Sequence, residues 1–183
     1  MEAQNPWQTL SSRLIYENAW IAVTEHQVIR PDGQPGIYGT VHFQSDAVGV
    51  VPYADGWIWL VGQWRYPLGR YEWEIPEGGS PPGEDPEATA RRELKEETGL
   101  EAEQLRPILE MNLSNSVSDE WGIVYLATGL RQREAEPEGT EVLSIRKVRL
   151  EDAYREVEAR QIRDSLSVAA IYKLMLMRAA GEL

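Results

Sequence analysis

The first third of the chain alternates apolar and polar residues, which predicts β-strands. The alternation runs from Ser11 to Tyr53 around an interruption at Pro31-Asp32-Gly33. Side chains of a strand point to opposite faces in turn, so a period of two is typical of a half-buried strand, and Pro-Asp-Gly favours a turn. We therefore expect two or three strands, followed by strands at Ala47–Tyr53 and Trp57–Trp64 joined by a turn at Ala54-Asp55-Gly56.

The rest of the chain mixes short apolar runs with segments of helical periodicity. The expected elements are an extended piece at Tyr71–Ile75, strands near Ile108–Leu113, Gly122–Gly129 and Val142–Val148, and helices at about Leu150–Arg160 and Ile162–Ala180. Strands and helices mixed in this way suggest helices packed on both sides of a mixed sheet. We see neither an internal repeat nor a dividing linker, so we expect a single domain over residues 1–183.

A short helix after a Gly/Pro-rich loop carries the strongest chemical signal. Asp85 suits the N-cap, Pro86 the first helical position, and Gly99 the left-handed position after the last turn. Three carboxylates share one face of this helix: Glu93, Glu96 and Glu97. Like charges at this spacing repel, and a hard divalent cation such as Mg²⁺ would offset the repulsion. The alternative is a solvated acidic face with ion pairs between residues four apart.

The spacing of this segment resembles the signature of the Nudix hydrolases. Every defined position is matched over twenty-three residues: Gly78, Glu84, Arg92-Glu93-Leu94, Glu96-Glu97 and Gly99-Leu100. The resemblance implies a Nudix fold of the α+β class, an α/β/α sandwich around a mixed β-sheet. It also implies hydrolysis of a nucleoside diphosphate linked to another group, with Mg²⁺ or Mn²⁺ as the cofactor.

Further segments resemble the ADP-ribose and nucleoside-diphosphate-sugar pyrophosphatase branch of this family. They are Arg13–Gly33, Gly62–Pro67, Trp73–Gly79 and Ile162–Ser167. This resemblance implies cleavage of ADP-ribose or a related nucleotide sugar to a nucleoside monophosphate and a sugar phosphate. It also implies a homodimer, often with N-terminal strands, at about residues 11–45, exchanged between subunits. Asn115 stands where ADP-ribose pyrophosphatases typically carry a proline, which leaves GDP-mannose, other nucleotide sugars and dinucleotides open as substrates.

The resemblance implies a role for each charged residue of the signature. Metal ligands are expected from the carboxylates of Glu93, Glu97 and Glu96 and from a backbone carbonyl near Glu77 or Gly78. Glu97, as a principal ligand, is then also part of the catalytic machinery. Gly78, Glu84 and Arg92 are expected to order the loop and the helix, and a plain surface ion pair is the alternative for Arg92.

A general base and the substrate contacts are expected outside the helix. Glu141 is the first candidate for the base and Glu120 the second, and either could instead be a solvated loop acid. Arg65 is the best candidate for a phosphate contact, because a guanidinium group matches phosphate oxygens bidentately. Glu74 lies in the segment that favours nucleotide sugars. The alternative for Arg65 is a strand-end arginine stacked on an adjacent aromatic ring.

Composition limits the binding partners and the cellular location that we expect for this protein. The net charge of −12 argues against a general binder of nucleic acid or anionic membranes, whereas bound cations still allow a polyphosphate substrate. The chain has no cysteine, no secretory signal at its start and no apolar run as long as a membrane span, so a cytoplasmic protein is the simplest expectation. Two other functions stay open: hydrolysis of a different polyphosphate, such as a nucleoside triphosphate or a dinucleotide, and ligand binding on a Nudix fold without hydrolysis.

Overall fold

The computed structural model describes residues 4–133 and 143–183, and its contacts divide the chain into two compact units. We call residues 1–46 and 112–121 the N-terminal unit, and residues 47–111 and 122–183 the main unit. The single domain expected over residues 1–183 stays a prediction. In the described residues, no helix is long and apolar enough to cross a membrane.

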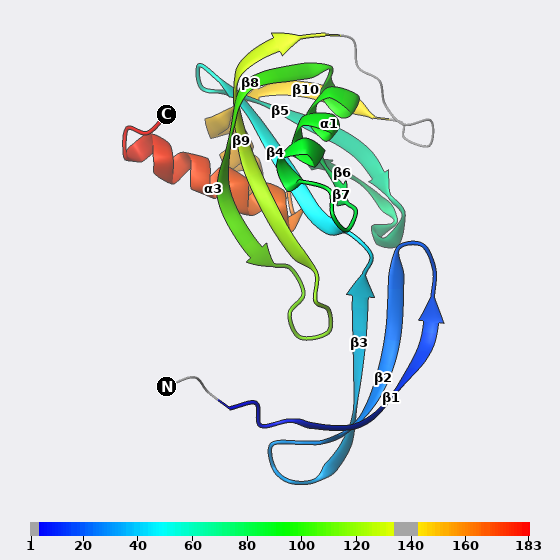
Figure 1. The fold of residues 1–183 in the computed structure, drawn as a ribbon. Helices are drawn as coiled ribbons and strands as arrows, with labels where there is room; N and C mark the ends of the chain where they lie inside the picture. Colours follow the sequence, from blue (N-terminus) through cyan, green and yellow to red (C-terminus); the bar gives the residue numbers. More distant parts are fainter. Residues whose placement is uncertain (1–3, 134–142) are drawn as a thin grey trace. The chain divides into compact units, whose positions relative to one another are not determined.

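The N-terminal unit is built on a three-stranded antiparallel sheet (Figure 1). Its strands lie in the order β1 (Gln8–Glu17), β2 (Ile21–Ile29) and β3 (Pro35–Phe43). The expected turn between β2 and β3 is present: the Arg30 amide donates to the Gln34 carbonyl at 2.9 Å, and Gly33 has a φ of 78°. A positive φ favours glycine, which explains this residue at the turn. All ten residues of β1 are exposed.

The loop of residues 112–121 pairs with strand β3 inside the same unit. The amide of Val41 donates to the carbonyl of Val117 at 2.8 Å. His42 Nδ1 lies 2.6 Å from a carboxylate oxygen of Asp119, whose other oxygen accepts a hydrogen bond from the Phe43 amide at 3.3 Å. The Ser-Asp-Glu stretch that follows Asn115 is therefore held against β3.

The main unit contains a mixed sheet in the order β10-β5-β4-β9-β8, with β6 paired to β5 and β7 to β4. Strands β4 and β9 are parallel, whereas β5 is antiparallel to β4, β6 and β10. The bounds are β4 (Asp46–Ala54), β5 (Trp57–Arg65), β6 (Arg70–Glu74), β7 (Glu77–Ser80), β8 (Leu100–Asn112), β9 (Trp121–Gln132) and β10 (Ser144–Arg149), with a 3₁₀ turn η1 at Tyr66–Leu68. The expected turn between β4 and β5 has positive φ at both Asp55 and Gly56, the geometry of a tight hairpin.

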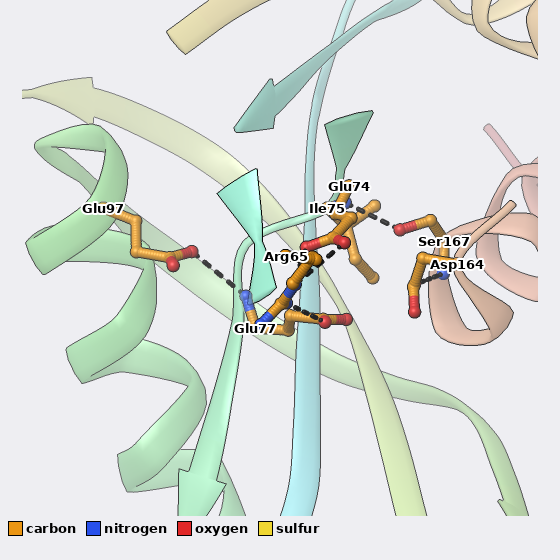
Figure 2. A network of polar contacts seen from close by, with 7 residues as sticks. All are labelled: Arg65, Glu74, Ile75, Glu77, Glu97, Asp164 and Ser167. Atoms are coloured by element: carbon orange, nitrogen blue, oxygen red, sulfur yellow. Dashed lines mark hydrogen bonds and ion pairs between the residues drawn. The ribbon is translucent and has the colours of Figure 1, made fainter. Parts of the chain in front are cut away.

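Three helices belong to the main unit: α1 (Pro86–Thr98), α2 (Leu150–Glu158) and α3 (Ser165–Ala179). Figure 2 shows α1 and α3 on opposite sides of the strands. Consecutive residues Val50 and Val51 of β4 are both fully buried, which requires cover on both faces of the strand. The sandwich of helices around a mixed sheet is therefore confirmed.

Most expected elements are present, with shifted ends. The capping of α1 is as expected: Asp85 Oδ1 accepts from the Glu87 amide at 3.1 Å, and Gly99 has a φ of 67°. Strand β8 begins at Leu100 rather than near Ile108, because several of its first residues are exposed and give no apolar alternation. Helix α3 begins at Ser165 rather than Ile162 because Asp164 caps it. Val142, the expected start of β10, lies outside the described residues.

Candidate active site

The acidic face of α1 is largely buried. Glu93 and Glu97 are 8% and 2% exposed, beside the buried Ala90 and Leu94 on the same helix. Residues three and four apart share a helix face, so the carboxylates that the sequence places together point the same way as the apolar residues. A buried charge is costly without a partner, so these carboxylates require hydrogen bonds, a countercharge or a bound cation.

Arg92 is the local countercharge and ties α1 to the preceding loop. Its Nη1 donates to Glu93 at 2.6 Å and to Glu96 at 3.0 Å, and its Nη2 donates to the carbonyl of Gly79 at 3.2 Å. The same guanidinium lies 3.8 Å from Glu84. These contacts to three carboxylates and to the loop backbone are more than a surface ion pair requires, and they suit the supporting role predicted for Arg92 and Glu84.

The loop between β6 and β7 is held at three consecutive residues. The Ile75 amide donates to Ser167 Oγ of α3 at 2.8 Å, and the Pro76 carbonyl accepts from the Val50 amide of β4 at 2.8 Å. The Glu77 amide donates to Glu97 Oε2 of α1 at 3.1 Å, as Figure 2 shows. The backbone of Glu77 therefore lies against the acidic face of α1.

The side chain of Glu77 joins an ion-pair network centred on Arg65. Arg65 Nε donates to both oxygens of Glu74 at 2.9 Å, and its Nη2 donates to Glu74 and Glu77 at 2.6 Å each (Figure 2). Burial raises the pKa of the Glu77 carboxyl well above its usual range, Asp164 and Glu74 add to the shift, and Arg65 opposes it. Among the described residues, the second Glu77 oxygen has no hydrogen-bond partner.

The two residues predicted to contact the substrate, Arg65 and Glu74, form an ion pair with each other. Arg65, proposed to contact phosphate, and Glu74, proposed to contact the substrate, form a bidentate pair in which Glu74 is 3% exposed and Arg65 one third exposed. A guanidinium group has five N–H donors, and these pairs use only its Nε and Nη2 sides. Among the described residues, Arg65 forms ion pairs with Glu74 and Glu77, while its role as a phosphate contact stays a prediction.

Gly78 provides the space that Glu93 occupies. A Cβ atom built on Gly78 would collide with the Glu93 carboxylate, which lies directly over the glycine. The glycine that the sequence signature demands is therefore needed for close approach between the loop and α1.

We expect Gly78→Ala to lower the affinity for Mn²⁺ by at least about tenfold, because the added methyl group displaces the Glu93 carboxylate from the loop. Titration of the purified protein with Mn²⁺, followed by the electron paramagnetic resonance of the free ion, measures this. Gly39→Ala is the matched control, since a Cβ at Gly39 in β3 meets nothing within 4 Å. Unchanged affinity in Gly78→Ala would contradict the placement of Glu93 in the metal site.

The donor set fits a hard divalent cation. Carboxylates from Glu93, Glu96 and Glu97 and a backbone carbonyl at Glu77 or Gly78 supply oxygen ligands, the type that Mg²⁺ and Mn²⁺ prefer. In the part of the chain that the structure describes, no group of three or more acidic or histidine side chains converges as a ligand set. In the structure, Arg92 donates to Glu93 and Glu96, and Glu97 accepts from the Glu77 amide.

The two candidates for the general base are Glu120 and Glu141. Glu120 belongs to the N-terminal unit, where its carbonyl accepts from the Leu113 amide at 3.0 Å. Glu141 lies outside the described residues. Both assignments stay predictions.

Sequence reasoning missed two features of the site. The first is the ion pair between Arg65 and Glu74. The register pairs Arg65 with Arg70 and Val61 with Glu74, so Arg65 and Glu74 share one face of the β5–β6 hairpin, and this register is known only from the structure. No local signal marks the second, the hydrogen bond from Ile75 to Ser167, because these residues are far apart in sequence.

Comparison with known proteins supports the same fold and family. The NUDIX domain model matches residues 44–167, and the model of a nucleoside diphosphate sugar hydrolase N-terminal domain matches residues 7–41. An ADP-ribose pyrophosphatase from Bacillus subtilis (strain 168) is 35% identical over 175 residues, 94% of each chain. A methanol dehydrogenase activator from Bacillus methanolicus is 30% identical over 174 residues, again 94% of each chain. The crystal structure of an ADP compounds hydrolase covers 100% of both chains with a TM-score of 0.87 at 20% identity, which shows the fold.

The chain therefore belongs to the Nudix family. Within that family it is a hydrolase that acts on phosphoanhydride bonds. Nudix hydrolases generally depend on a divalent metal, in agreement with the acidic face of α1.

Proposed function

We propose that this protein hydrolyses the diphosphate of ADP-ribose or a related nucleoside-diphosphate sugar, with Mg²⁺ as the cofactor and Mn²⁺ as a substitute. The observation that carries the proposal is the packing of the buried acidic face of α1 against the backbone of Glu77 and Gly78. Two similarities support the substrate class. Residues 7–41 match the model of a nucleoside diphosphate sugar hydrolase N-terminal domain, and the Bacillus subtilis relative is an ADP-ribose pyrophosphatase.

The residues on and beside α1 have two roles in the proposed reaction, metal binding and support of the metal ligands. Glu93, Glu96 and Glu97, with the carbonyl of Glu77 or Gly78, would hold the metal. When bound, the metal would stabilise the negative charge on the phosphate oxygens of the substrate and lower the pKa of the attacking water. Arg92 keeps the carboxylates of α1 in place through its contacts to Glu93 and Glu96.

Arg65 and a loop glutamate complete the proposed mechanism. Positioning and charge stabilisation provide most of the catalysis in reactions at phosphorus. Arg65 would contact a phosphate oxygen while Glu74 and Glu77 fix its orientation. Glu141 is the proposed base that takes the proton from the attacking water, with Glu120 as the second choice. The bond between phosphorus and the bridging oxygen breaks, and the products are a nucleoside monophosphate and a sugar phosphate.

We also propose a homodimer formed through the N-terminal unit, with a small nucleotide as substrate and neither nucleic acid nor membrane as a partner. In β1, four large apolar side chains are more than half exposed: Leu10, Leu14, Ile15 and Tyr16. An exposed apolar edge strand is a template for pairing with a second copy. The net charge of −12 disfavours nucleic acid and anionic lipid. The cytoplasmic location stays a prediction.

A substrate panel tests the proposed activity. With Mg²⁺ or Mn²⁺, we expect ADP-ribose or a nucleotide sugar to give a nucleoside monophosphate and a sugar phosphate, identified by chromatography. The panel contains ADP-ribose, GDP-mannose, ADP-glucose, UDP-glucose, NADH, diadenosine polyphosphates and nucleoside triphosphates, each with a parallel sample in excess chelator. We expect cleavage to stop in the chelator samples, because the carboxylates of α1 act through the bound cation.

Other outcomes of the panel identify the alternatives. Release of pyrophosphate from a triphosphate, or cleavage of a dinucleotide alone, would replace the nucleotide-sugar assignment by another polyphosphate hydrolase. No cleavage of any compound with either metal would favour a ligand-binding role.

A further inference from the structure

Ser167 is a fully buried hydroxyl in the first turn of α3. A serine inside a helix often bonds a carbonyl of its own preceding turn. Here the Ser167 oxygen accepts instead from the Ile75 amide at 2.8 Å, from a residue 92 positions away in the chain. The Ser167 amide in turn donates to the capping carboxylate of Asp164 at 2.7 Å. The start of α3 is thus fixed by its cap, and its hydroxyl faces the loop between β6 and β7.

The Ser167 hydroxyl accepts a hydrogen bond from one of the two backbone amides that the loop can donate. Pro76 has no N–H, so the donors at positions 75 to 77 are the amides of Ile75 and Glu77. The Glu77 amide donates to Glu97, a proposed metal ligand. The Ile75 amide donates to Ser167, which is outside the proposed ligand set. Ser167 is therefore a side chain through which this loop can be loosened without removing a ligand.

The Ile75 side chain packs beside α3, which links the position of this helix to that of the loop. Ile75 is fully buried. A Cβ atom built on Gly49 of β4 would lie 2.9 Å from Ile75 Cδ1 and 3.5 Å from Leu166 Cδ1, so the side chains of Ile75 and Leu166 both lie over this glycine. Figure 2 shows the result: Ser167 on one side of Ile75 and Glu97 on the other side of Glu77.

We propose that Ser167 is a positioning residue of the metal site, which sets where the Glu77 backbone meets Glu97 by holding the Ile75 amide. The proposal rests on the proposed function, since it takes Glu97 as a metal ligand. Without the hydroxyl, the Ile75 amide is left buried and without a partner, and the loop shifts to satisfy it. The Glu77 amide then no longer orients Glu97, and a lost orienting group of this kind weakens metal binding.

Three variants of the full chain test the proposal. We expect Ser167→Ala to raise the Mn²⁺ dissociation constant about tenfold, measured without substrate by the electron paramagnetic resonance of free Mn²⁺. Ser167→Cys fills the site with a somewhat larger thiol that is a weaker acceptor, so a smaller increase is expected and a second variant is available if the alanine variant folds poorly. Ile171→Val is the matched control: Ile171 is fully buried in the same helix, one turn beyond Ser167, and the loss of one methylene lowers thermal stability while the Ser167 hydroxyl is kept.

The Mn²⁺ affinities of the three variants and of the unmodified protein either support or overturn the positioning role of Ser167. Weaker Mn²⁺ binding in both Ser167 variants, with wild-type affinity in Ile171→Val, supports the positioning role. Wild-type affinity in a folded Ser167→Ala overturns it, and so does an equal loss in Ile171→Val, because the effect then follows stability alone. Absence of Mn²⁺ binding by the unmodified protein is a distinct result that overturns the proposed metal site and this inference with it.

Discussion

Glu97→Gln should lower Mg²⁺-supported turnover by at least about a hundredfold while leaving the fold intact. Glu97 is almost fully buried on α1 and accepts the Glu77 amide at 3.1 Å. A glutamine oxygen can still accept that hydrogen bond, so the loop keeps its anchor. The negative charge is lost, and this weakens a proposed principal ligand of the cation. Initial rates with the best substrate, together with the thermal unfolding midpoint, measure both parts of the expectation.

Glu87→Gln is the matched control for this variant. Glu87 lies in the first turn of the same helix, has a side chain that is 42% exposed, and pairs with Arg91 at 2.8 Å. Loss of an exposed pair between residues four apart changes stability by only about 0.5 kcal/mol, and turnover should stay at the wild-type level. Near-normal activity in Glu97→Gln would remove this residue from the metal site.

Arg65→Met should destabilise the protein by about 3 kcal/mol and lower turnover as well. The number is the lower end for breaking a buried ion pair, because a third of the Arg65 side chain is exposed. In the described residues, Arg65 is the cation paired with both Glu74 and Glu77. Among the described residues, its loss leaves the buried Glu74 and the half-buried Glu77 without an ion-pair partner, directly beside the acidic face of α1. Urea unfolding gives the stability change, and steady-state kinetics give the change in turnover.

Arg70→Met offers a comparison within the same hairpin. Arg70 pairs with the buried Glu72, but Glu72 also accepts from Arg163 at 3.0 Å and so keeps a countercharge when Arg70 is removed. The expected cost is about 1 kcal/mol or less, with little change in turnover. Equal losses in the two variants would show that Arg65 has no special place in the network.

The fold was largely predictable because its elements carry local signals. The turn at Pro31-Asp32-Gly33, the cap at Asp85 and the left-handed Gly99 depend on the conformational preferences of single residues, and the structure has each of them in place. The acidic face of α1 was predictable for the same reason, since helix geometry alone brings Glu93 and Glu97 together.

The rest of the site depends on contacts between distant segments. Arg65 was interpreted as a substrate contact from its residue type, whereas the structure gives it Glu74 and Glu77 as immediate partners. The Ser167 hydroxyl could not be assigned at all, because neither helix periodicity nor the cap at Asp164 indicates what faces α3. The start of β8 at Leu100 was missed because exposed strand residues show no alternation.

The hydrogen bond between Ile75 and Ser167 also constrains the order in which the molecule becomes native. It joins residues 92 positions apart, whereas Glu77 and Glu97 are only 20 apart. Contacts between distant residues carry the larger closure entropy and tend to form late in folding. A nascent chain can therefore form α1 and its carboxylates well before α3 has left the ribosome. Until α3 docks, the Ile75 amide lacks its native acceptor, so the loop between β6 and β7 is fully held only after this late contact has formed.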